Sequence, residues 1–571
     1  MTSPLLSLLR ASTLALACAM VPATSQAEIA HGAYLAALSA RQAEDFAPAA
    51  KYFQAALAAD PDNPILMEES LRALIALGDF ATAKPIAVRL DQDPEHSQLA
   101  AMVLLGDLIT SKAWEKILPG QEARSLRIAP PVDGLVKAWV LAQTTGLKAG
   151  LAQLDLLISQ RDMAVFALYH RALMLAMAGD FAEAEAVFAG SGSAPLPLTR
   201  RGVLARVEVL SQIGAQEQAL ALLNEAFDGA QEPPIEALKA KLAAGEKLPF
   251  SIAATPTEGL AEVFYTVSLA LGSDGPAAYA LAFSRMAELI NPQHFDAAML
   301  SGSLLDGLGQ HDLAIQTLAK IPVASTNGFA AQVGRAQALV SAERYDEAIA
   351  ALTEITTTYP NLPAGFRTLA DALRDQQRWE EAAAAYTKAA ELYGPPQEQD
   401  WGIYYMRAIA YEQIGKWAEA EADLRLALKL RPDQPQILNN LGYSLLERKE
   451  NLDEALALIE KAVKAQPKTG YIVDSLGWAY YRLGRYDEAV VTMERAAALM
   501  ATDPEVNDHL GDVYWAVGRK REANFQWRRA LSFRDDRASV DFDRIIRKLE
   551  VGLDQVLAEE GAPPLAPRPA N

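Results

Sequence analysis

Cysteine is almost absent from this 571-residue sequence. Its one cysteine, Cys18, lies near the amino terminus, and the sequence offers it no partner for an intramolecular disulfide. If the amino-terminal segment is removed, the mature chain has no cysteine, which excludes both disulfides and thiol chemistry. A chain of this kind is compatible with an oxidising compartment.

Positive charge is also scarce. The sequence has 52 lysines and arginines against 72 acidic residues, a formal net charge of −20. We therefore expect no nucleic-acid partner, because binding to phosphates needs a basic surface. Long apolar runs are missing as well: 51% of the residues are apolar, enough for a continuous core, but no run after the amino terminus is long enough to span a membrane.

Strand patterns and catalytic motifs are absent too. From Ile29 onward the apolar residues follow a helical period, with no alternation long enough to predict a β-strand. No metalloprotease motif, phosphate-binding loop or dinucleotide fingerprint is present. We expect no catalytic residue, metal or cofactor, because the histidines are scattered without a second ligand at metal spacing; they are His31, His96, His170, His294, His311 and His509.

The amino-terminal segment, residues 1–27, has the pattern of a secretory signal. Arg10 is the one charged side chain in it, residues 11–21 form a short apolar core, and Ser25-Gln26-Ala27 has the small-x-small pattern of a cleavage site. We therefore predict that residues 1–27 are a signal peptide, cleaved after Ala27, and that the chain is exported.

The alternative for this segment is a bacterial lipoprotein. Ala15-Leu16-Ala17-Cys18 would then act as a lipobox, although the leucine and the small residue stand in the reverse of the usual order. In that case the chain is an outer-membrane lipoprotein, and the lipid on Cys18 is its contact with the membrane.

The most regular part of the sequence runs from Pro435 to Leu531, where one pattern recurs three times. Its small residues belong where two helices approach most closely, since a larger side chain would hold the helices apart, and the large residues between them fill the core. The recurring residues are, copy by copy, Leu441-Gly442 and Ala455, then Leu476-Gly477, Tyr480 and Ala489, then Leu510-Gly511, Tyr514 and Ala523.

The same register extends toward the amino terminus. Copies that begin at Ala261, Phe295, Phe329 and Pro363 follow one another at steps of 34, and their twentieth positions hold Ala280, Ala314, Ala348 and Ala382. The next copy begins four residues late, near Trp401, because one loop is longer. Before residue 261 the pattern is weaker, and the prolines of residues 229–259 indicate a boundary between two halves.

A period of 34 with this spacing resembles the tetratricopeptide repeat family. The resemblance implies an all-α fold, a superhelical solenoid of about twelve helix-turn-helix repeats with a C-terminal capping helix. The predicted segments are a signal peptide (1–27), a degenerate N-terminal array (28–245), an irregular linker (246–260), a regular C-terminal array (261–535), a capping helix (536–558) and a disordered tail (559–571).

In this family, positions 2, 5, 6, 9, 12 and 13 of each first helix face a concave groove. In the last four repeats these positions hold aromatic rings interleaved with amides and carboxylates, which suits a bound peptide. The alternative is that some rings pack against a neighbouring helix. The candidate peptide-binding residues are Tyr405, Asn439, Asn440, Tyr443, Asp474, Trp478, Tyr481, Asp508, His509, Asp512 and Trp515.

Some tetratricopeptide domains grip the C-terminal carboxylate of a peptide with lysine, asparagine and arginine at fixed groove positions. Asn440 fits the middle asparagine of that clamp, but the other positions hold Tyr405, Ile409, Tyr471 and Ser475. The clamp is therefore absent. The groove carries carboxylates instead, and we expect it to favour neutral or basic segments.

The whole chain resembles the large periplasmic tetratricopeptide proteins of Gram-negative bacteria. Within that group it is similar to lipoprotein adaptors of a carboxyl-terminal processing protease, through the motif Asp474-Ser475-Leu476-Gly477-Trp478 and then Asp508-His509-Leu510-Gly511-Asp512. The resemblance implies a non-enzymatic periplasmic scaffold that binds proteins or peptides in its groove and presents clients, such as cell-wall hydrolases, to the protease.

Two other functions stay open. One is a structural component of an envelope-assembly or polysaccharide-export machine, which would use the convex surface formed by the second helices. The other is an enzyme, for which the sequence offers no site.

Overall fold

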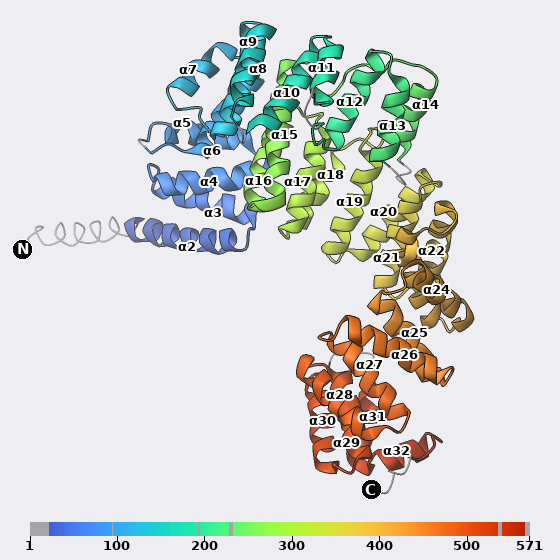
Figure 1. Ribbon diagram of the computed structural model, residues 1–571. Helices are drawn as coiled ribbons and strands as arrows, with labels where there is room; N and C mark the ends of the chain where they lie inside the picture. Colours follow the sequence, from blue (N-terminus) through green and yellow to red (C-terminus); the bar gives the residue numbers. More distant parts are fainter. Residues whose placement is uncertain are drawn as a thin grey trace, which may run out of the picture. The chain divides into compact units, whose positions relative to one another are not determined.

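The computed structural model describes residues 22–93, 95–160, 163–190, 195–227, 232–534 and 540–565. Over these residues the chain is helical, with no β-strand, and successive helices pair as hairpins that stack along the chain (Figure 1). The predicted all-α solenoid of helical hairpins is therefore confirmed. The chain divides after Leu362 into two compact units, called unit 1 and unit 2.

Parts of three predictions lie outside the described residues. These are the apolar core of the signal peptide with Cys18, the start of the capping helix at residues 536–539, and the tail from residue 566. The expected cleavage position after Ala27 falls inside the first described helix, α2 (Pro22–Gln42). Across the described ranges, no helix is both long and apolar enough to cross a membrane.

Unit 1 continues from α2 through a long series of helices. They are α3 (Phe46–Ala59), α4 (Pro64–Leu77), α5 (Phe80–Leu90), α6 (Gln98–Thr110), α7 (Ile117–Glu122), α8 (Pro130–Thr144), α9 (Leu147–Ile158), α10 (Ala164–Met177), α11 (Phe181–Phe188), α12 (Arg200–Gln212), α13 (Gln216–Ala226), α14 (Pro233–Ala243), α15 (Pro256–Asp274), α16 (Ala277–Ile290), α17 (Phe295–Gly307), α18 (His311–Ala319), α19 (Gly328–Ser341) and α20 (Tyr345–Thr358), with a short 3-10 helix, η1 (Trp114–Lys116).

The two halves of unit 1 share one core. Helices α15 and α16 lie against the earlier helices α4, α6, α8 and α10 (Figure 1), and one hydrophobic cluster extends from Ala37 to Ala297. Arg285 of α16 reaches α4, where its Nε donates to the carbonyl of Ala76 at 3.0 Å. The main division of the chain therefore lies at Leu362, well beyond the predicted linker.

The prolines that suggested the linker have a local explanation. Pro233 and Pro256 stand in the first turns of α14 and α15, where the missing N–H of proline costs nothing. Thr255 caps α15 through a capping box with Glu258. Residues 246–255 are irregular as expected, but the chain on both sides of them packs into the same core.

Unit 2 contains the regular repeats and the C-terminal helices. Its elements are α21 (Pro363–Asp375), α22 (Trp379–Tyr393), η3 (Glu398–Asp400), α23 (Trp401–Gln413), α24 (Trp417–Leu430), α25 (Pro435–Arg448), α26 (Leu452–Ala465), α27 (Gly470–Arg482), α28 (Tyr486–Leu499), α29 (Pro504–Ala516), α30 (Lys520–Ser532), α31 (Phe542–Val551) and α32 (Leu553–Glu559).

Small residues mark the closest helix contacts of unit 2, as the sequence predicted. A Cβ added to Gly477 would meet Met493, and one added to Gly511 would meet the indole of Trp527. The alanines at position twenty of successive copies, such as Ala382 and Ala489, are fully buried. The register of the repeats therefore follows from sites that tolerate no larger side chain.

The predicted capping helix consists of two helices, α31 and α32, rather than one. They separate at Gly552, whose φ of 85° is in the left-handed region. A Cβ at Gly552 would also meet the ring of Trp515. Helix α31 packs on α30 and so covers the last hairpin of unit 2.

Candidate functional site

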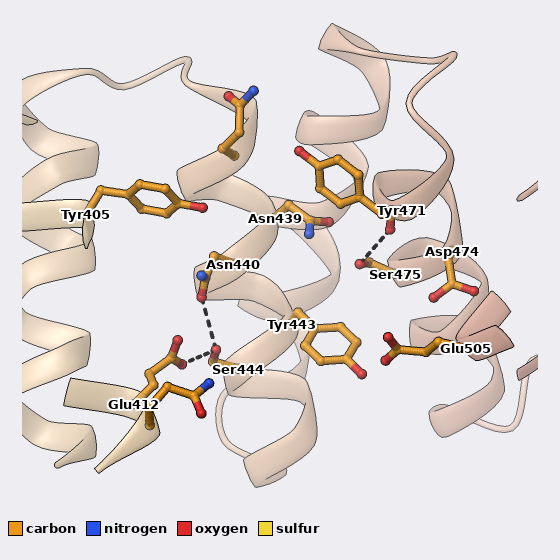
Figure 2. A pocket seen from close by; sticks show the side chains of 12 residues that line it. Tyr405, Glu412, Asn439, Asn440, Tyr443, Ser444, Tyr471, Asp474, Ser475 and Glu505 are labelled. Atoms are coloured by element: carbon orange, nitrogen blue, oxygen red, sulfur yellow. Dashed lines mark hydrogen bonds between the residues drawn. The ribbon is translucent and has the colours of Figure 1, made fainter. Parts of the chain in front are cut away.

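The first helices of four consecutive repeats in unit 2, α23, α25, α27 and α29, border a cavity of about 490 Å³ (Figure 2). We call it the C-terminal cavity. It is lined by Tyr405, Glu412, Gln413, Gln436, Asn439, Asn440, Tyr443, Ser444, Tyr471, Asp474, Ser475 and Glu505. The structure thus brings together, among the predicted site residues, Tyr405, Asn439, Asn440, Tyr443 and Asp474.

The repeat geometry explains this gathering. The fifth residues of the four first helices are Tyr405, Asn439, Asp474 and Asp508. Because the hairpins stack in register, equivalent positions of successive first helices lie next to one another on the same face. Three of these four side chains reach the C-terminal cavity, and the fourth contacts the C-terminal helices.

Three tyrosine rings form the apolar part of the wall. Tyr471 is the most open, with 43% of its surface exposed. Burial raises the pKa of Tyr405 and Tyr471, and for Tyr443 the nearby carboxylates of Glu447 and Glu505 add to this effect of burial. The phenols therefore stay protonated and can donate hydrogen bonds.

The polar part of the wall consists of amides, hydroxyls and carboxylates. Ser444 bridges two helices, because its hydroxyl lies beside the carboxylate of Glu412 and 3.3 Å from Oδ1 of Asn440. Burial raises the pKa of Glu412, although the contact with Ser444 partly opposes this. The residues that line the cavity include three carboxylates, Glu412, Asp474 and Glu505, and neither lysine nor arginine.

Asp474 is held from outside the cavity by His509. The Nδ1 atom of His509 lies 2.9 Å from Oδ2 of Asp474. Burial, the largest single effect, would lower the pKa of His509, but the carboxylate of Asp474, helped by those of Glu505 and Asp508, raises it to about 9. The imidazole is therefore protonated at neutral pH and forms an ion pair with Asp474.

Trp478, Tyr481 and His509 form a stack beside the cavity. The ring centroids of Trp478 and Tyr481 are 4.7 Å apart, and those of Trp478 and His509 are 4.0 Å apart. Nε1 of Trp478 also donates to Oε1 of Glu447 at 2.7 Å. Trp478 is 9% exposed and the other two residues are 8% exposed, so the three pack against one another and do not form an exposed ladder.

Asp508, Asp512 and Trp515 contact the C-terminal helices. Nζ of Lys548 lies 2.8 Å from both carboxylate oxygens of Asp508 and 2.8 Å from Oδ2 of Asp512. Nε1 of Trp515 donates to Oδ2 of Asp554 at 3.0 Å. Helices α31 and α32 therefore occupy the part of the first-helix face that these side chains were expected to offer to a peptide. A binding role for them stays a prediction.

Most lining residues that the prediction missed occupy groove positions named from the sequence. Gln436 and Glu505 are second residues of their helices, Ser475 is a sixth residue, and Glu412 and Gln413 are twelfth and thirteenth residues. The position rule alone would have found them. The predicted set also included Asp508, Asp512 and Trp515, which contact α31 and α32.

A second group of titratable side chains is buried in unit 1 around Glu262. Its carboxylate accepts hydrogen bonds from Tyr169 at 2.9 Å and from Nε of Arg201 at 2.9 Å, and Nε2 of His294 lies 3.1 Å away. Burial alone would raise the pKa of Glu262, but the charge of Arg201 and the contact with His294 hold it at about 2. The group ties α10, α12 and α15 to the start of α17, and we interpret it as structural.

The side chains of the described residues do not form a group of three or more histidines, cysteines, aspartates or glutamates that could hold a metal ion.

Comparison with known proteins identifies the repeats. A family model described as tetratricopeptide repeat matches residues 34–95, 367–435, 405–469 and 444–505, and a second model with the same description matches residues 165–189. Over these residues the chain matches tetratricopeptide repeats. These matches fall in both units and include the first helices α23, α25 and α27 of the C-terminal cavity.

The chain is also similar to individual proteins. A tetratricopeptide repeat-containing protein of Pseudomonas aeruginosa is 39% identical over 87 residues, which are 15% of this chain and 15% of that protein. One chain in the crystal structure of the APC/C heterotetramer Cut9–Hcn1 is 15% identical, with a TM-score of 0.37 over 93% of this chain and 98% of that chain. A tetratricopeptide repeat protein of Parabacteroides merdae is also 15% identical, with a TM-score of 0.38 over 45% and 98%.

Proposed function

We propose that this chain is a non-enzymatic scaffold whose tetratricopeptide repeats bind a segment of a partner protein at the C-terminal cavity. The observation that supports the proposal most is the cavity itself, of about 490 Å³ and bordered by four consecutive first helices. Its wall combines tyrosine rings, which suit side chains, with amides and hydroxyls, which suit a peptide backbone.

The cavity suits an extended ligand better than a small molecule. Its lining residues are spread over four helices in four repeats, so a ligand that contacts all of them has to lie across the hairpins. Two amides, Asn439 and Asn440, stand near the middle of the cavity (Figure 2). Amides at such positions pair with both the N–H and the C=O groups of a peptide.

The proposal includes a place in the cell. The amino-terminal sequence pattern supports export, and the resemblance to periplasmic tetratricopeptide adaptors supports a role in presenting clients, such as cell-wall hydrolases, to a carboxyl-terminal processing protease. Fractionation of the native host, followed by N-terminal sequencing of the mature chain, tests the first step. A mature chain that begins at Glu28 supports export and cleavage after Ala27. A mature chain that begins at Cys18 and carries a lipid supports the lipoprotein alternative instead.

Site-specific photocrosslinking tests the binding proposal. A photoreactive phenylalanine analogue replaces Tyr471 in the cavity or Phe525 on α30, and both side chains are exposed, by 43% and 69%. We expect crosslinks to a defined partner segment from position 471. The proposal is wrong if position 525 gives the crosslinks and position 471 gives none.

One observation favours the second candidate, a structural component that uses its convex surface. Val491 of α28 and Phe525 of α30 occupy equivalent positions in successive repeats and are each 69% exposed. Two apolar side chains in register on the second helices offer a small contact surface. Crosslinks from position 525 alone would support this function.

A further inference from the structure

Contacts within unit 2 show which kind of side chain can be buried against the face formed by the first helices of its repeats. Lys548 of α31 is fully buried, and its ammonium group lies between the carboxylates of Asp508 and Asp512 on α29. The three side chains meet at distances of 2.8 Å. A lysine from a packed helix is therefore an occupant that this face accepts, because the aspartates offset the cost of burying its charge.

In the C-terminal cavity, Asp474 occupies the position that Asp508 occupies in the contact with Lys548. It is the fifth residue of α27, as Asp508 is the fifth residue of α29, so the two occupy equivalent positions in successive repeats. Both oxygens of Asp508 contact Lys548. By contrast, only Oδ2 of Asp474 has a hydrogen-bond partner, His509, and Oδ1 has none among the described residues.

Asn439 adds a second oxygen without a partner. Its Oδ1 accepts no hydrogen bond within the described part of the chain. Asn439 is 8% exposed and Asp474 is 6% exposed, and both line the C-terminal cavity (Figure 2). A buried oxygen without a donor costs about 1–3 kcal/mol. Both oxygens are covered by neighbouring atoms, so a donor on a ligand reaches them only after a side-chain rotation.

The charge and shape of the cavity point to the kind of donor. The lining residues supply the carboxylates of Glu412 and Glu505 in addition to Asp474, and no lysine or arginine. The rings of Tyr443 and Tyr471 can pack along the aliphatic stem of a long cationic side chain, which also gains from the faces of the rings. Among the charged residues that line the cavity, an acidic segment would meet only like charges.

We propose that the C-terminal cavity binds the side chain of a lysine or arginine in the partner segment, with its charged head among the lining carboxylates of Glu412, Asp474 and Glu505. The partner is then a protein segment with a basic residue, as α31 is within this chain. This inference rests on the proposed function and adds the chemical class of the ligand to it.

A phage-displayed library of random dodecapeptides, selected on the full chain, tests the inference. We expect the enriched peptides to share a lysine or arginine, and exchange of that residue for glutamine in a synthetic copy should weaken binding at least about tenfold. Glu505→Gln should weaken binding of the same peptide, and increasing salt should do so as well. Asp453→Asn removes one exposed carboxylate from α26 and should leave binding unchanged.

The outcomes separate the inference from the proposed function. If the enriched peptides need no basic residue, but Tyr443→Ala weakens their binding, the proposed function stands and this inference is wrong. If no peptide depends on Glu505 or Tyr443, both are wrong. Asp474→Asn serves as a second variant, and its circular dichroism spectrum shows whether loss of the pair with His509 has unfolded the repeat.

Discussion

At the scale of single residues, the pair of Asp474 and His509 connects the core of unit 2 to its cavity. Asp474 lines the cavity, and one of its oxygens contacts the protonated His509. His509 in turn stacks on Trp478. The position of a carboxylate in the cavity thus depends on a histidine that lies one repeat further along the chain.

We predict that the His509 ring titrates near pH 9. In Asp474→Asn the midpoint should fall, because the carboxylate that raises the pKa most is gone, burial remains, and the carboxylates of Glu505 and Asp508 raise the pKa less. His170 provides an internal control, since burial lowers its pKa to about 4. Histidine-selective NMR spectra recorded over a pH series measure all three values. A His509 midpoint that is the same in both proteins would contradict the ion pair.

The same shift makes the stability of unit 2 depend on pH. The folded-state pKa of His509 lies above its unfolded value of about 6.5, so the stabilisation is complete below that pH and is lost as the pH rises through about 9. We therefore expect the loss in unfolding free energy caused by Asp474→Asn to be larger at about pH 6 than at about pH 10. Urea denaturation at the two pH values measures it, and equal losses would contradict the prediction.

At the scale of helices, close contact at small residues sets the register of the hairpins. We predict that Gly511→Ala destabilises unit 2 by about 1–3 kcal/mol, because the new methyl group would meet the indole of Trp527. Gly402→Ala is the matched control: it also lies in a first helix, but nothing lies within 4 Å of its added Cβ. There we expect no loss, and a gain of up to about 1 kcal/mol from helix propensity. Equal effects in denaturation experiments would contradict the close-contact explanation.

The C-terminal helices are held by Lys548. We predict that Lys548→Met destabilises unit 2 by about 3–5 kcal/mol, because Asp508 is left buried without its ion-pair partner. Among the described residues, Asp512 then keeps only Arg544, at 3.7 Å, as an ion-pair partner. Lys464→Met on α26 removes an exposed lysine and should change stability by no more than about 0.5 kcal/mol. The difference in thermal midpoint between the two variants checks the prediction. A similar midpoint for both would mean that α31 is held by its apolar contacts alone.

Much of the helical architecture was predictable from the sequence, and the reasons are local. Ala382 and Ala489 mark contacts that any hairpin of this kind makes, and Asn63 and Asp503 accept the backbone hydrogen bonds that such side chains usually accept at the start of a helix. The late start at Trp401 also follows directly from the length of the preceding loop.

What the sequence did not predict depends on contacts between distant residues. Lys548 follows Ile545 by one helical turn on the buried side of α31, but only packing on α29 shows that two aspartates face it. In the same way, the stacking of Trp478 between Tyr481 and His509 requires the relative placement of two repeats. Position within the repeat indicates which side chains share a face. It does not indicate that α31 and α32 of the same chain cover part of that face.

At the scale of the whole molecule, the chain divides into two compact units after Leu362. We predict that residues 363–565, expressed alone, fold into a helical protein with one cooperative unfolding transition, because this unit has its own core and its own C-terminal helices. Circular dichroism and thermal unfolding measure this. A fragment that stays unfolded, or that regains helix only when residues 1–362 are added, would contradict the division.

The most direct test of the proposed function measures how tightly the partner segment identified by crosslinking binds to three versions of the full chain. These are the unmodified chain, the double variant Tyr443→Ala/Tyr471→Ala in the C-terminal cavity, and Phe525→Ala on α30. Isothermal titration calorimetry should show a loss of affinity of about tenfold or more for the double variant and no change for Phe525→Ala. The opposite result, a loss for Phe525→Ala and none for the double variant, would place the working surface on the second helices and contradict the proposal.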